Sequence, residues 1–338
     1  MRSLFSKKGL TYFVSFSLCA FIFFGIGISY WFQHPHHNKS TVVLIPKGAS
    51  LTQIASHLNT QGVLDLPLLF KAFLYGTRSW KDLKAGEYFI PEAISPAQLI
   101  YILKKGDVIL HPVSLIEGET SHSLVQKLLA DTRFEGACDI PPEGTILPET
   151  YHFPRGTIRS HIIAHMQKTM KEKLTEVWAQ RPSTHPLHSP EELVVLASII
   201  EKETALSSEK PFVAAVFLNR LKQGMPLQAD PTVLYALTEG KGGLGRDLTR
   251  HDLQVESPYN TYLKPGLPPF PIANPSLSSL KAIVSPAAVP YLYFVADGSG
   301  GHVFATTLEE HQQNHAAWRK VQKKSQETIK KKPSKGIL

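Results

Sequence analysis

Cysteine is almost absent from this sequence, which has only Cys19 and Cys138 among its 338 residues. Cys19 falls within a long apolar segment near the N-terminus, so Cys138 has no partner in the rest of the chain. A fold held together by disulfides is therefore excluded. With 43% hydrophobic residues, the chain is instead long enough to bury a core in two or three domains.

Familiar catalytic signatures are also missing. The sequence has no GxSxG, HExxH, Walker or paired CxxC motif. Two S-x-x-K matches, at 207–210 and 278–281, lack the KTG and SDN motifs of penicillin-binding enzymes and are short enough to arise by chance. The glycine-rich stretch at 239–245 lacks the context of a phosphate loop, and HPHH at 34–37 lacks carboxylates. We therefore predict no metal and no cofactor.

Acidic residues are fewer than basic ones, 28 against 36, which gives a net charge of +8. Much of the excess lies near the two ends of the chain. No basic patch is interleaved with aromatic residues, so nucleic acid is not predicted as a partner. The basic C-terminal segment is of a kind that is usually solvated, and it could also contact anionic lipid or polymer.

Residues 10–32 are apolar, carry no charge and are long enough to cross a bilayer. They end in the aromatic cluster Tyr30, Trp31 and Phe32, which is typical of a membrane interface. The cationic segment before them predicts an N-terminus in the cytoplasm and a remainder that is periplasmic or extracytoplasmic. The alternative is a cleaved signal peptide. We favour an uncleaved anchor in the inner membrane, because the apolar part exceeds a signal core and no A-x-A site follows.

The exported part alternates short β-type runs with amphipathic helices. TVVLIPKG and KAGEYFI read as strands, and SLTQIASHL and SPAQLIYILKKG as helices with Ser50 and Ser95 as N-caps. Pro96 fits the first helical position and Gly106 the stop. VSLIEGETSHSLVQKLL repeats the opening pattern, and a further helix is expected from about 158 to 179.

These patterns predict an α+β protein with a single N-terminal transmembrane helix and two mixed α/β parts. The expected segments are a cytoplasmic N-terminus (1–9), the membrane helix (10–32), a linker (33–40), a first mixed module (41–108), a connector with the second strand–helix repeat (109–180), a second mixed α/β domain (181–318) and a basic tail (319–338).

Two glutamates end the apolar run LASIIEKETA at 196–205. The helix begins with Ser189, Pro190 and Glu192 as a capping box. At 100° per residue, Glu203 continues the stripe of apolar residues at 193, 196 and 200, and Glu201 lies about 160° away. A half-buried carboxyl has a raised pKa, as a general acid requires, so Glu203 is the candidate catalytic residue. The stripe could also end before Glu203, leaving that residue in solvent.

Glu201 is then expected to face solvent or to hold the helix in place. Downstream, LQADPTVLY and the loop SPYNTY supply amides, tyrosines and an acid that suit a sugar-binding cleft, and Asp230 is also a plausible N-cap. GLPPFPIANP predicts a rigid extended wall, and YLYFVADGSGGHVFATT a β-hairpin around a glycine turn. The candidate substrate-binding residues are Gln228, Asp230, Tyr259, Asn260, Thr261 and Tyr262. For Asn260 we expect substrate contact with little effect on stability.

In this order, LASIIEKET, LQADPTVLY, SPYNTY, GLPP and YFVADGSGGHVF resemble the endolytic murein transglycosylase family, the MltG or YceG-like proteins. The resemblance extends to VVLIPKGASLTQIASHL, LKAGEYFI and ILPETYHF, and so covers about 41–318. It places the family's catalytic glutamate at Glu203. The sequence departs from the family pattern at Phe270 and Ser276, where glycine is usual, which leaves the shape of that wall open.

The resemblance implies a membrane anchor, a LysM-like module of the peptidoglycan-binding type, and a catalytic domain. It implies cleavage of the MurNAc–GlcNAc β-1,4 bond of nascent glycan strands to give 1,6-anhydroMurNAc ends, which would limit strand elongation. Peptidoglycan synthases of the elongation or division machinery are implied partners. Two alternatives stay open: a non-catalytic cell-wall-binding anchor, and a glycan hydrolase that uses Glu203 as acid and Asp230 as base.

Overall fold

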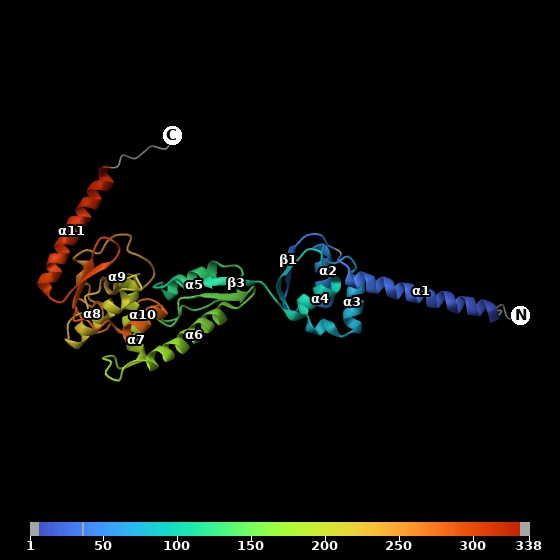
Figure 1. The fold of residues 1–338 in the computed structure, drawn as a ribbon, viewed down its shortest axis with the longest axis horizontal. Coiled ribbons are helices and arrows are strands. Elements are labelled where there is room, and N and C mark those ends of the chain that lie inside the picture. The colour runs from blue at the N-terminus through green and yellow to red at the C-terminus, as the bar shows by residue number, and fades with distance from the viewer. Residues whose placement is uncertain (1–6, 36, 332–338) are drawn as a thin grey trace. The chain divides into compact units, whose positions relative to one another are not determined.

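The structure is a computed structural model that describes residues 7–35 and 37–331. The chain forms two compact units (Figure 1). Unit 1 comprises the described residues up to His111 together with His152–Gly156, and unit 2 comprises Pro112–Tyr151 and the described residues from Thr157 onward. Residues 1–6 of the expected cytoplasmic segment, His36 of the expected linker and residues 332–338 of the expected tail lie outside the described residues.

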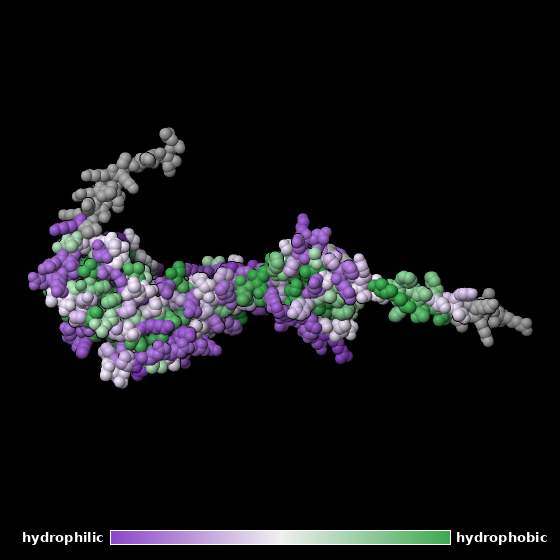
Figure 2. Space-filling view, in the orientation of Figure 1, coloured by the Kyte–Doolittle hydropathy of each residue, from purple (hydrophilic) through white to green (hydrophobic). Residues whose placement is uncertain are grey.

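Helix α1 (Lys7–Gln33) contains the apolar segment, and its stretch from Thr11 to Gln33 has a mean hydropathy of 2.0 and is exposed along most of its length. Figure 2 shows its described part as a hydrophobic surface. Among the described helices it alone is long and apolar enough to cross a membrane, and a signal sequence would have the same properties. The far end of α1 belongs to the core of unit 1, because Trp31 is 7% exposed and packs among the buried residues of that unit.

Unit 1 is built around a two-stranded antiparallel sheet of β1 (Thr41–Ile45) and β2 (Gly86–Ile90), with Thr41 opposite Ile90 and Ile45 opposite Gly86. Between the strands lie α2 (Leu51–Thr60), α3 (Pro67–Gly76) and the short 3-10 helix η1 (Ser79–Asp82), and α4 (Pro96–Lys105) follows. The two strands present alternate residues to a core that they share with the helices. This core includes Val43, Ile45, Leu58, Phe70, Leu74, Tyr88, Ile90, Leu99 and Leu103.

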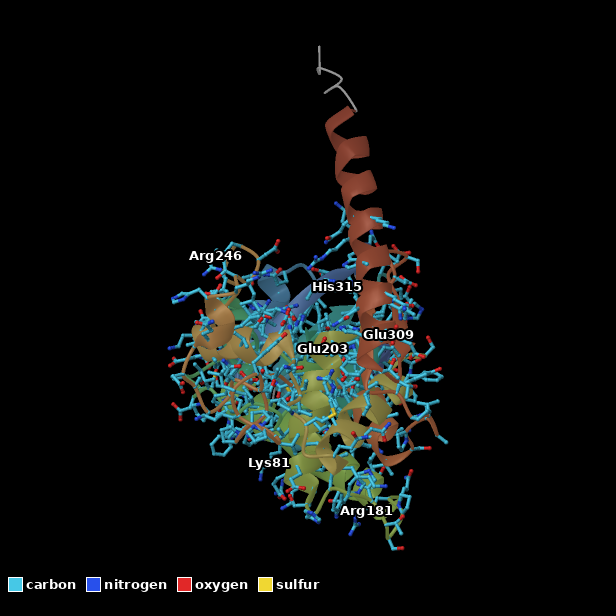
Figure 3. The ribbon with its side chains drawn as sticks, turned by 90° about the vertical axis from the view of Figure 1, so that its left-hand side faces the viewer. Lys81, Arg181, Glu203, Arg246, Glu309 and His315 are labelled. Carbon is cyan, nitrogen blue, oxygen red and sulfur yellow. The ribbon has the colours of Figure 1, made fainter. Side chains whose placement is uncertain are left out.

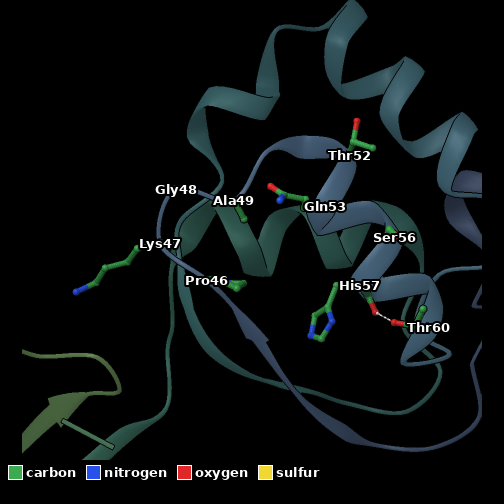
Figure 4. A pocket seen from close by; sticks show the side chains of 9 residues that line it. All are labelled: Pro46, Lys47, Gly48, Ala49, Thr52, Gln53, Ser56, His57 and Thr60. Carbon is green, nitrogen blue, oxygen red and sulfur yellow. Dashed lines mark hydrogen bonds between the residues drawn. The ribbon is translucent and has the colours of Figure 1, made fainter. Parts of the chain in front are cut away.

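The expected caps of this unit are confirmed. Ser50 and Ser95 each form a capping box with the glutamine three residues later, and Pro96 occupies the first turn of α4. Gly106 ends α4 with a φ of 78°, a left-handed conformation that glycine adopts without strain. A hollow of about 630 Å³ lies along the β1–α2 turn (Figure 4). It is lined by Pro46, Lys47, Gly48, Ala49, Thr52, Gln53, Ser56, His57 and Thr60.

The boundary between the units runs through β3 (Leu110–Ser114) and β4 (Thr150–Pro154), which form a second two-stranded sheet. As the repeat predicted, β3 leads through a glycine turn to the cap Thr120 and then to α5 (Ser121–Ala130). Helix α6 (Arg159–Ala179) matches the helix expected from about 158 to 179.

The core of unit 2 surrounds α7 (Pro190–Glu203), which packs against α6, α8 (Lys210–Lys222), α9 (Asp230–Thr238) and α10 (Leu277–Val284). The short 3-10 helix η2 (Asp252–Gln254) lies beside α9. Ser189 caps α7 as expected, but only half of the predicted capping box forms. The carboxylate of Glu192 accepts from the backbone N–H of His188 and not from that of Ser189.

Every residue of α7 from Leu193 to Glu201 is buried, so this helix has no single inward stripe. The predicted hairpin is confirmed as β5 (Tyr293–Ala296) paired antiparallel with β6 (His302–Ala305). Helix α11 (Leu308–Lys331) follows and packs against β5. Residues 319–331 of the expected basic tail belong to this helix.

The burial of Trp31 predicts that two adjacent aromatic residues of α1 differ in their contribution to unit 1. Trp31→Ala should lower the free energy of unfolding of unit 1 by about 3 kcal/mol, because it leaves a cavity in the core. Tyr30→Ala is the matched control, since Tyr30 is 62% exposed, and it should change stability by less than about 0.5 kcal/mol. Denaturant unfolding of the full chain in detergent measures both, and equal effects would contradict the packing of Trp31.

Candidate active site

Glu203 is the last residue of α7, its side chain is half-buried, and it is labelled in Figure 3. Burial raises the pKa of Glu203 to about 8, and the negative charge of Asp230 adds to this, whereas Arg220 opposes it. The carboxyl is therefore protonated over most of the neutral range and can donate a proton. The expectation that Glu203 is partly buried is confirmed.

Arg220 is a residue that sequence reasoning missed. It lies on α8, is 8% exposed, and donates from Nε to the carbonyl of Leu292 at 2.6 Å and from Nη1 to that of Leu227 at 2.8 Å. Its guanidinium carbon lies 5.1 Å from the ring centroid of Tyr293. An arginine in an otherwise apolar helix, LNRLK, was the available signal in the sequence. The cation fixes the positions of the two chain segments beside Glu203.

Asp230 and Tyr262 form a pair that acts electrostatically on Glu203 or responds to its charge. The Tyr262 hydroxyl donates to Asp230 Oδ1 at 2.5 Å. The pKa of Tyr262 is raised, first by burial and then by the bond to Asp230 and the charge of Glu203, so the phenol stays protonated. The prediction that Asp230 caps α9 was wrong, because Ala229 is the N-cap position and the Asp230 carboxylate accepts from Tyr262 instead.

Gln228 and Tyr259 border the same region. Gln228 is exposed, has a left-handed φ of 51°, and its side-chain oxygen lies 3.5 Å from Nη1 of Arg220. Tyr259 is half-buried, and its ring lies 4.9 Å from that of Tyr235. Both remain predictions as substrate contacts.

Asn260 and Thr261 are buried inside the fold, with exposures of 0% and 2%. Asn260 donates to the carbonyls of Leu253 and Val255 at 3.0 and 2.9 Å, and its oxygen accepts from the N–H of Tyr262 at 2.9 Å. Thr261 bonds to the N–H of Ala229 at 3.0 Å. The expectation that Asn260 contacts sugar with little effect on stability therefore does not fit the structure. Both residues hold the loop that carries Tyr262.

Glu201, which we expected to face solvent or to hold the helix, is buried and holds it. Its side chain is 3% exposed and forms an ion pair with Lys210 at 2.8 Å. The other carboxylate oxygen accepts from the Ser276 N–H at 2.8 Å and from the Ser279 hydroxyl at 2.6 Å. Although burial acts to raise the pKa of Glu201, the bonds from Lys210 and the serines outweigh it and lower the pKa below its usual value. Glu201 therefore stays ionised and cannot act as the acid.

The cluster around Glu201 joins three elements. Lys210 begins α8, Ser276 caps α10, and Glu201 lies near the end of α7. Lys210 also donates to the hydroxyls of Ser276 and Ser278 at 3.0 and 2.9 Å. Ser276, one of the two departures from the family pattern, is thus a direct partner of Glu201, and its hydroxyl lies 2.5 Å from that carboxylate.

A second set of contacts, made by Glu209, joins the turn between α7 and α8 to the β5–β6 hairpin. The Glu209 carboxylate accepts from the backbone N–H of His302 at 2.8 Å and lies 2.7 Å from Nδ1 of that residue. It also accepts from the Thr204 hydroxyl at 3.1 Å. A side chain at Gly301 would approach Glu209 Oε1 to 2.8 Å, so glycine is needed for this contact. Thr204 directly follows Glu203, so these contacts fix the end of α7.

Within the part of the chain that the structure describes, no group of three or more His, Cys, Asp or Glu side chains could hold a metal ion.

The sequence profile of the YceG-like family matches residues 43–317. The chain belongs to the YceG-like family. A Bacillus subtilis (strain 168) protein named an endolytic murein transglycosylase is 33% identical over 314 residues, which covers 81% of this chain and 84% of that protein. A Streptococcus pneumoniae (strain D39) protein of the same name is 29% identical over 325 residues, and this YceG-like chain spans 58% of its length.

The fold agrees with this membership. A crystal structure of a putative YceG-like protein from Listeria monocytogenes matches with a TM-score of 0.54 at 30% identity, and the match covers 81% of this chain and 98% of that one.

The bonds of Asn260 predict a structural role that can be measured. Asn260→Ala should lower the free energy of unfolding of unit 2 by about 2 kcal/mol, because it leaves buried backbone groups without partners. Gln223→Ala is the control, since Gln223 is exposed at the end of α8. Thermal unfolding measures both variants. A loss of turnover at an unchanged melting temperature would instead restore the substrate-binding role.

Proposed function

We propose that this YceG-like protein is a lytic transglycosylase that cleaves the MurNAc–GlcNAc β-1,4 bond within nascent peptidoglycan strands and leaves 1,6-anhydroMurNAc ends. The observation that carries the proposal is the half-buried Glu203, whose pKa is raised to about 8 at the end of α7. The names of the curated relatives support the same activity class.

In the proposed reaction, protonated Glu203 donates its proton to the glycosidic oxygen as the bond to C1 of MurNAc breaks. The C6 hydroxyl of the same sugar attacks C1, and the Glu203 carboxylate accepts the hydroxyl proton. The C1–O4 bond is replaced by a C1–O6 bond, no water is consumed, and Glu203 ends protonated. One carboxyl thus acts in turn as acid and base, and a second carboxylate at hydrolase spacing is not needed.

The neighbours of Glu203 support both halves of this cycle. Burial and the charge of Asp230 keep the resting carboxyl protonated, and the charge of Arg220 favours the carboxylate that forms after donation. Tyr262, held by Asp230, presents a protonated phenol and an aromatic face of the kind that suits a pyranose.

The hydrolase alternative requires Asp230 to activate a water molecule. Its carboxylate already accepts a hydrogen bond from the Tyr262 hydroxyl, which favours a positioning role. If the protein were a non-catalytic anchor, the raised pKa of Glu203 would have no role in its function. Chemical analysis of the ends of the product strands distinguishes the three hypotheses, which are the lytic transglycosylase, the hydrolase and the non-catalytic anchor.

The setting of the enzyme is also proposed. Helix α1 would be an uncleaved single-pass anchor in the inner membrane, with the N-terminus in the cytoplasm and both units in the periplasm. Unit 1 would be a LysM-like module that holds glycan strands, and the hollow along α2 offers polar side chains such as Gln53 and His57 for this purpose (Figure 4). Cleavage near the membrane would limit the elongation of glycan strands, and peptidoglycan synthases would be partners of the enzyme.

The contrast between the two glutamates gives a direct test. Glu203→Gln should abolish formation of anhydro ends and keep its melting temperature, because the amide replaces a neutral carboxyl of the same shape. Glu201→Gln should lower the free energy of unfolding by about 3 kcal/mol, because it leaves the buried Lys210 with only the more distant Glu117, at 3.8 Å, as a counter-ion. Mass spectrometry of digested glycan strands and thermal unfolding measure the two effects.

Reducing ends in the wild-type digest would support the hydrolase, and absence of any cleavage would support the anchor. If Glu203→Gln retained activity while Glu201→Gln lost it at full stability, the assignment of the acid would be wrong.

The raised pKa of Glu203 predicts the pH dependence. Activity requires the protonated carboxyl, so kcat/KM should fall as pH rises through about 8. Stability should fall over the same window: because the folded-state pKa lies above the ordinary value of 4.5, the stabilising contribution of the neutral carboxyl is lost between pH 4.5 and about 8. Glu203→Gln should remove this part of the pH dependence of unfolding.

The charged and titratable neighbours of Glu203 are Asp230, Arg220 and Tyr262. A change at Asp230 tests whether Glu203 governs the pH dependence of kcat/KM. Asp230→Asn removes a negative charge beside Glu203, so the alkaline limb of kcat/KM should move to lower pH, whereas Gln223→Ala should leave the limb in place. An alkaline limb that did not move in Asp230→Asn would show that another group governs the profile.

A further inference from the structure

A hollow of about 510 Å³ runs along the N-terminal half of α11 and takes no part in the reaction described above. Its lining is almost entirely basic or amide-bearing. The lining residues are His311, Gln312, His315, Ala316 and Arg319.

The three basic residues occupy one face of the helix. His311, His315 and Arg319 are four residues apart, which places successive side chains about 40° from each other around α11. The rings of His311 and His315 lie 6.2 Å apart. Among the described residues, the buried Nδ1 of His311 has no hydrogen-bond partner. The row therefore has hydrogen-bonding capacity that the fold itself does not use.

This face is connected to the cleft through one tyrosine. The ring of His311 stacks on Tyr293, with centroids 5.2 Å apart and planes inclined by 21°. The guanidinium of Arg220 lies 5.1 Å from the centroid of the same Tyr293 ring. Arg220 acts electrostatically on Glu203 and on His311, so the hollow and the catalytic acid share one neighbour. His315 and Glu203 are both labelled in Figure 3, on α11 and at the end of α7.

The charge of the hollow selects an anion over a cation. Arg319 is permanently charged, and it would repel a metal ion that the histidine pair could otherwise bind. Glu310, the acidic residue adjacent to His311 in the sequence, is already engaged: its carboxylate accepts from the backbone N–H groups of Thr306 and Thr307 at 2.9 and 3.3 Å.

We propose that His311, His315 and Arg319 form an anion subsite of the cleft that binds carboxylate groups of the acidic stem peptide on MurNAc. This inference rests on the proposed function, since it supposes that the cleaved polymer is peptidoglycan. The stem peptide leaves the sugar at its lactyl group, beside the bond that Glu203 would cleave. From His311 to Arg319 the helix rises about 12 Å, which matches three to four residues of extended peptide.

The subsite would make the enzyme distinguish strands that carry peptides from bare glycan. Carboxylates on the peptide gain charge-assisted contacts with Arg319 and the imidazole N–H groups, whereas a bare strand gains none. The subsite would thus direct the enzyme to newly made strands, whose peptides have not yet been removed.

The test compares two substrates in the full-length protein in detergent. One substrate is uncrosslinked glycan with its stem peptides, and the other is the same glycan after an amidase has removed them. The measured quantity is the ratio of kcat/KM on the first substrate to that on the second. Arg319→Ala should lower this ratio about fivefold, and the double variant His315→Ala/Arg319→Ala about tenfold or more. Lys320→Ala, an equal loss of charge on the next residue, is the control and should leave the ratio unchanged.

Two further measurements test whether the positive charge of Arg319 and the carboxylates of the stem peptide account for the ratio. Arg319→Lys should recover part of the ratio, because the positive charge is kept. Amidation of the stem-peptide carboxylates should lower the ratio in the wild type and make it insensitive to Arg319→Ala.

Three outcomes would overturn the subsite: an unchanged ratio in the double variant, an equal fall in Lys320→Ala, or a wild-type ratio that amidation does not alter. A failure of the proposed function is distinct from these, because the wild type would then produce anhydro ends from neither substrate.

Discussion

The buried ion pair between Glu201 and Lys210 is the constraint on which the geometry of unit 2 depends. Removing Lys210 would leave the Glu201 carboxylate in the core without its counter-ion, a cost of about 3 to 5 kcal/mol, so the pair and its serine partners have to form together. They do so only when the end of α7, the start of α8 and the start of α10 meet, since the carboxylate accepts from Lys210, Ser276 and Ser279. The orientation of the last turn of α7, and with it the position of Glu203, follows from that meeting.

Two carboxyls two residues apart thus acquire opposite properties from their surroundings. Glu201 is the more deeply buried, yet hydrogen bonds and a cation keep its pKa low. Glu203 lies nearer to solvent, but it has no such partners, and Asp230 adds a like charge, so its pKa is high. Burial alone does not decide which of the two carboxyls has the raised pKa. The number of hydrogen-bond donors that face each carboxylate decides it, which is the physical basis for proposing Glu203 rather than Glu201 as the acid.

Much of the fold follows from local sequence signals. Ser50, Ser95 and Ser189 begin helices and Gly106 ends one, because capping depends on residues within one turn.

The sequence did not predict the features that depend on packing between segments far apart in the chain. The helical wheel placed Glu203 partly inward, as the structure does, but it assumed an amphipathic helix, and α7 is buried on all sides, so Glu201 turned out to be the more buried acid. Asn260 looked like a sugar ligand because its partners, the carbonyls of Leu253 and Val255, come from loop geometry that no periodicity predicts. Arg220 and Lys210 escaped notice for the same reason, because their roles come from residues as distant as Leu292 and Ser276.

The bonds that fix the end of α7 span long distances along the chain. Glu201 and Ser276 are 75 residues apart, and Glu209 and His302 are 93 apart. A chain that emerges from the ribosome with its N-terminus first therefore displays Glu203 well before the residues that hold it in place. Until α10 has appeared, Lys210 lacks the hydroxyls of Ser276 and Ser278, and until the hairpin has appeared, Glu209 lacks its contacts with His302. The surroundings of Glu203 are thus completed only after residues as far as His302 have been synthesised, so a polypeptide truncated before that point would leave the end of α7 without these bonds.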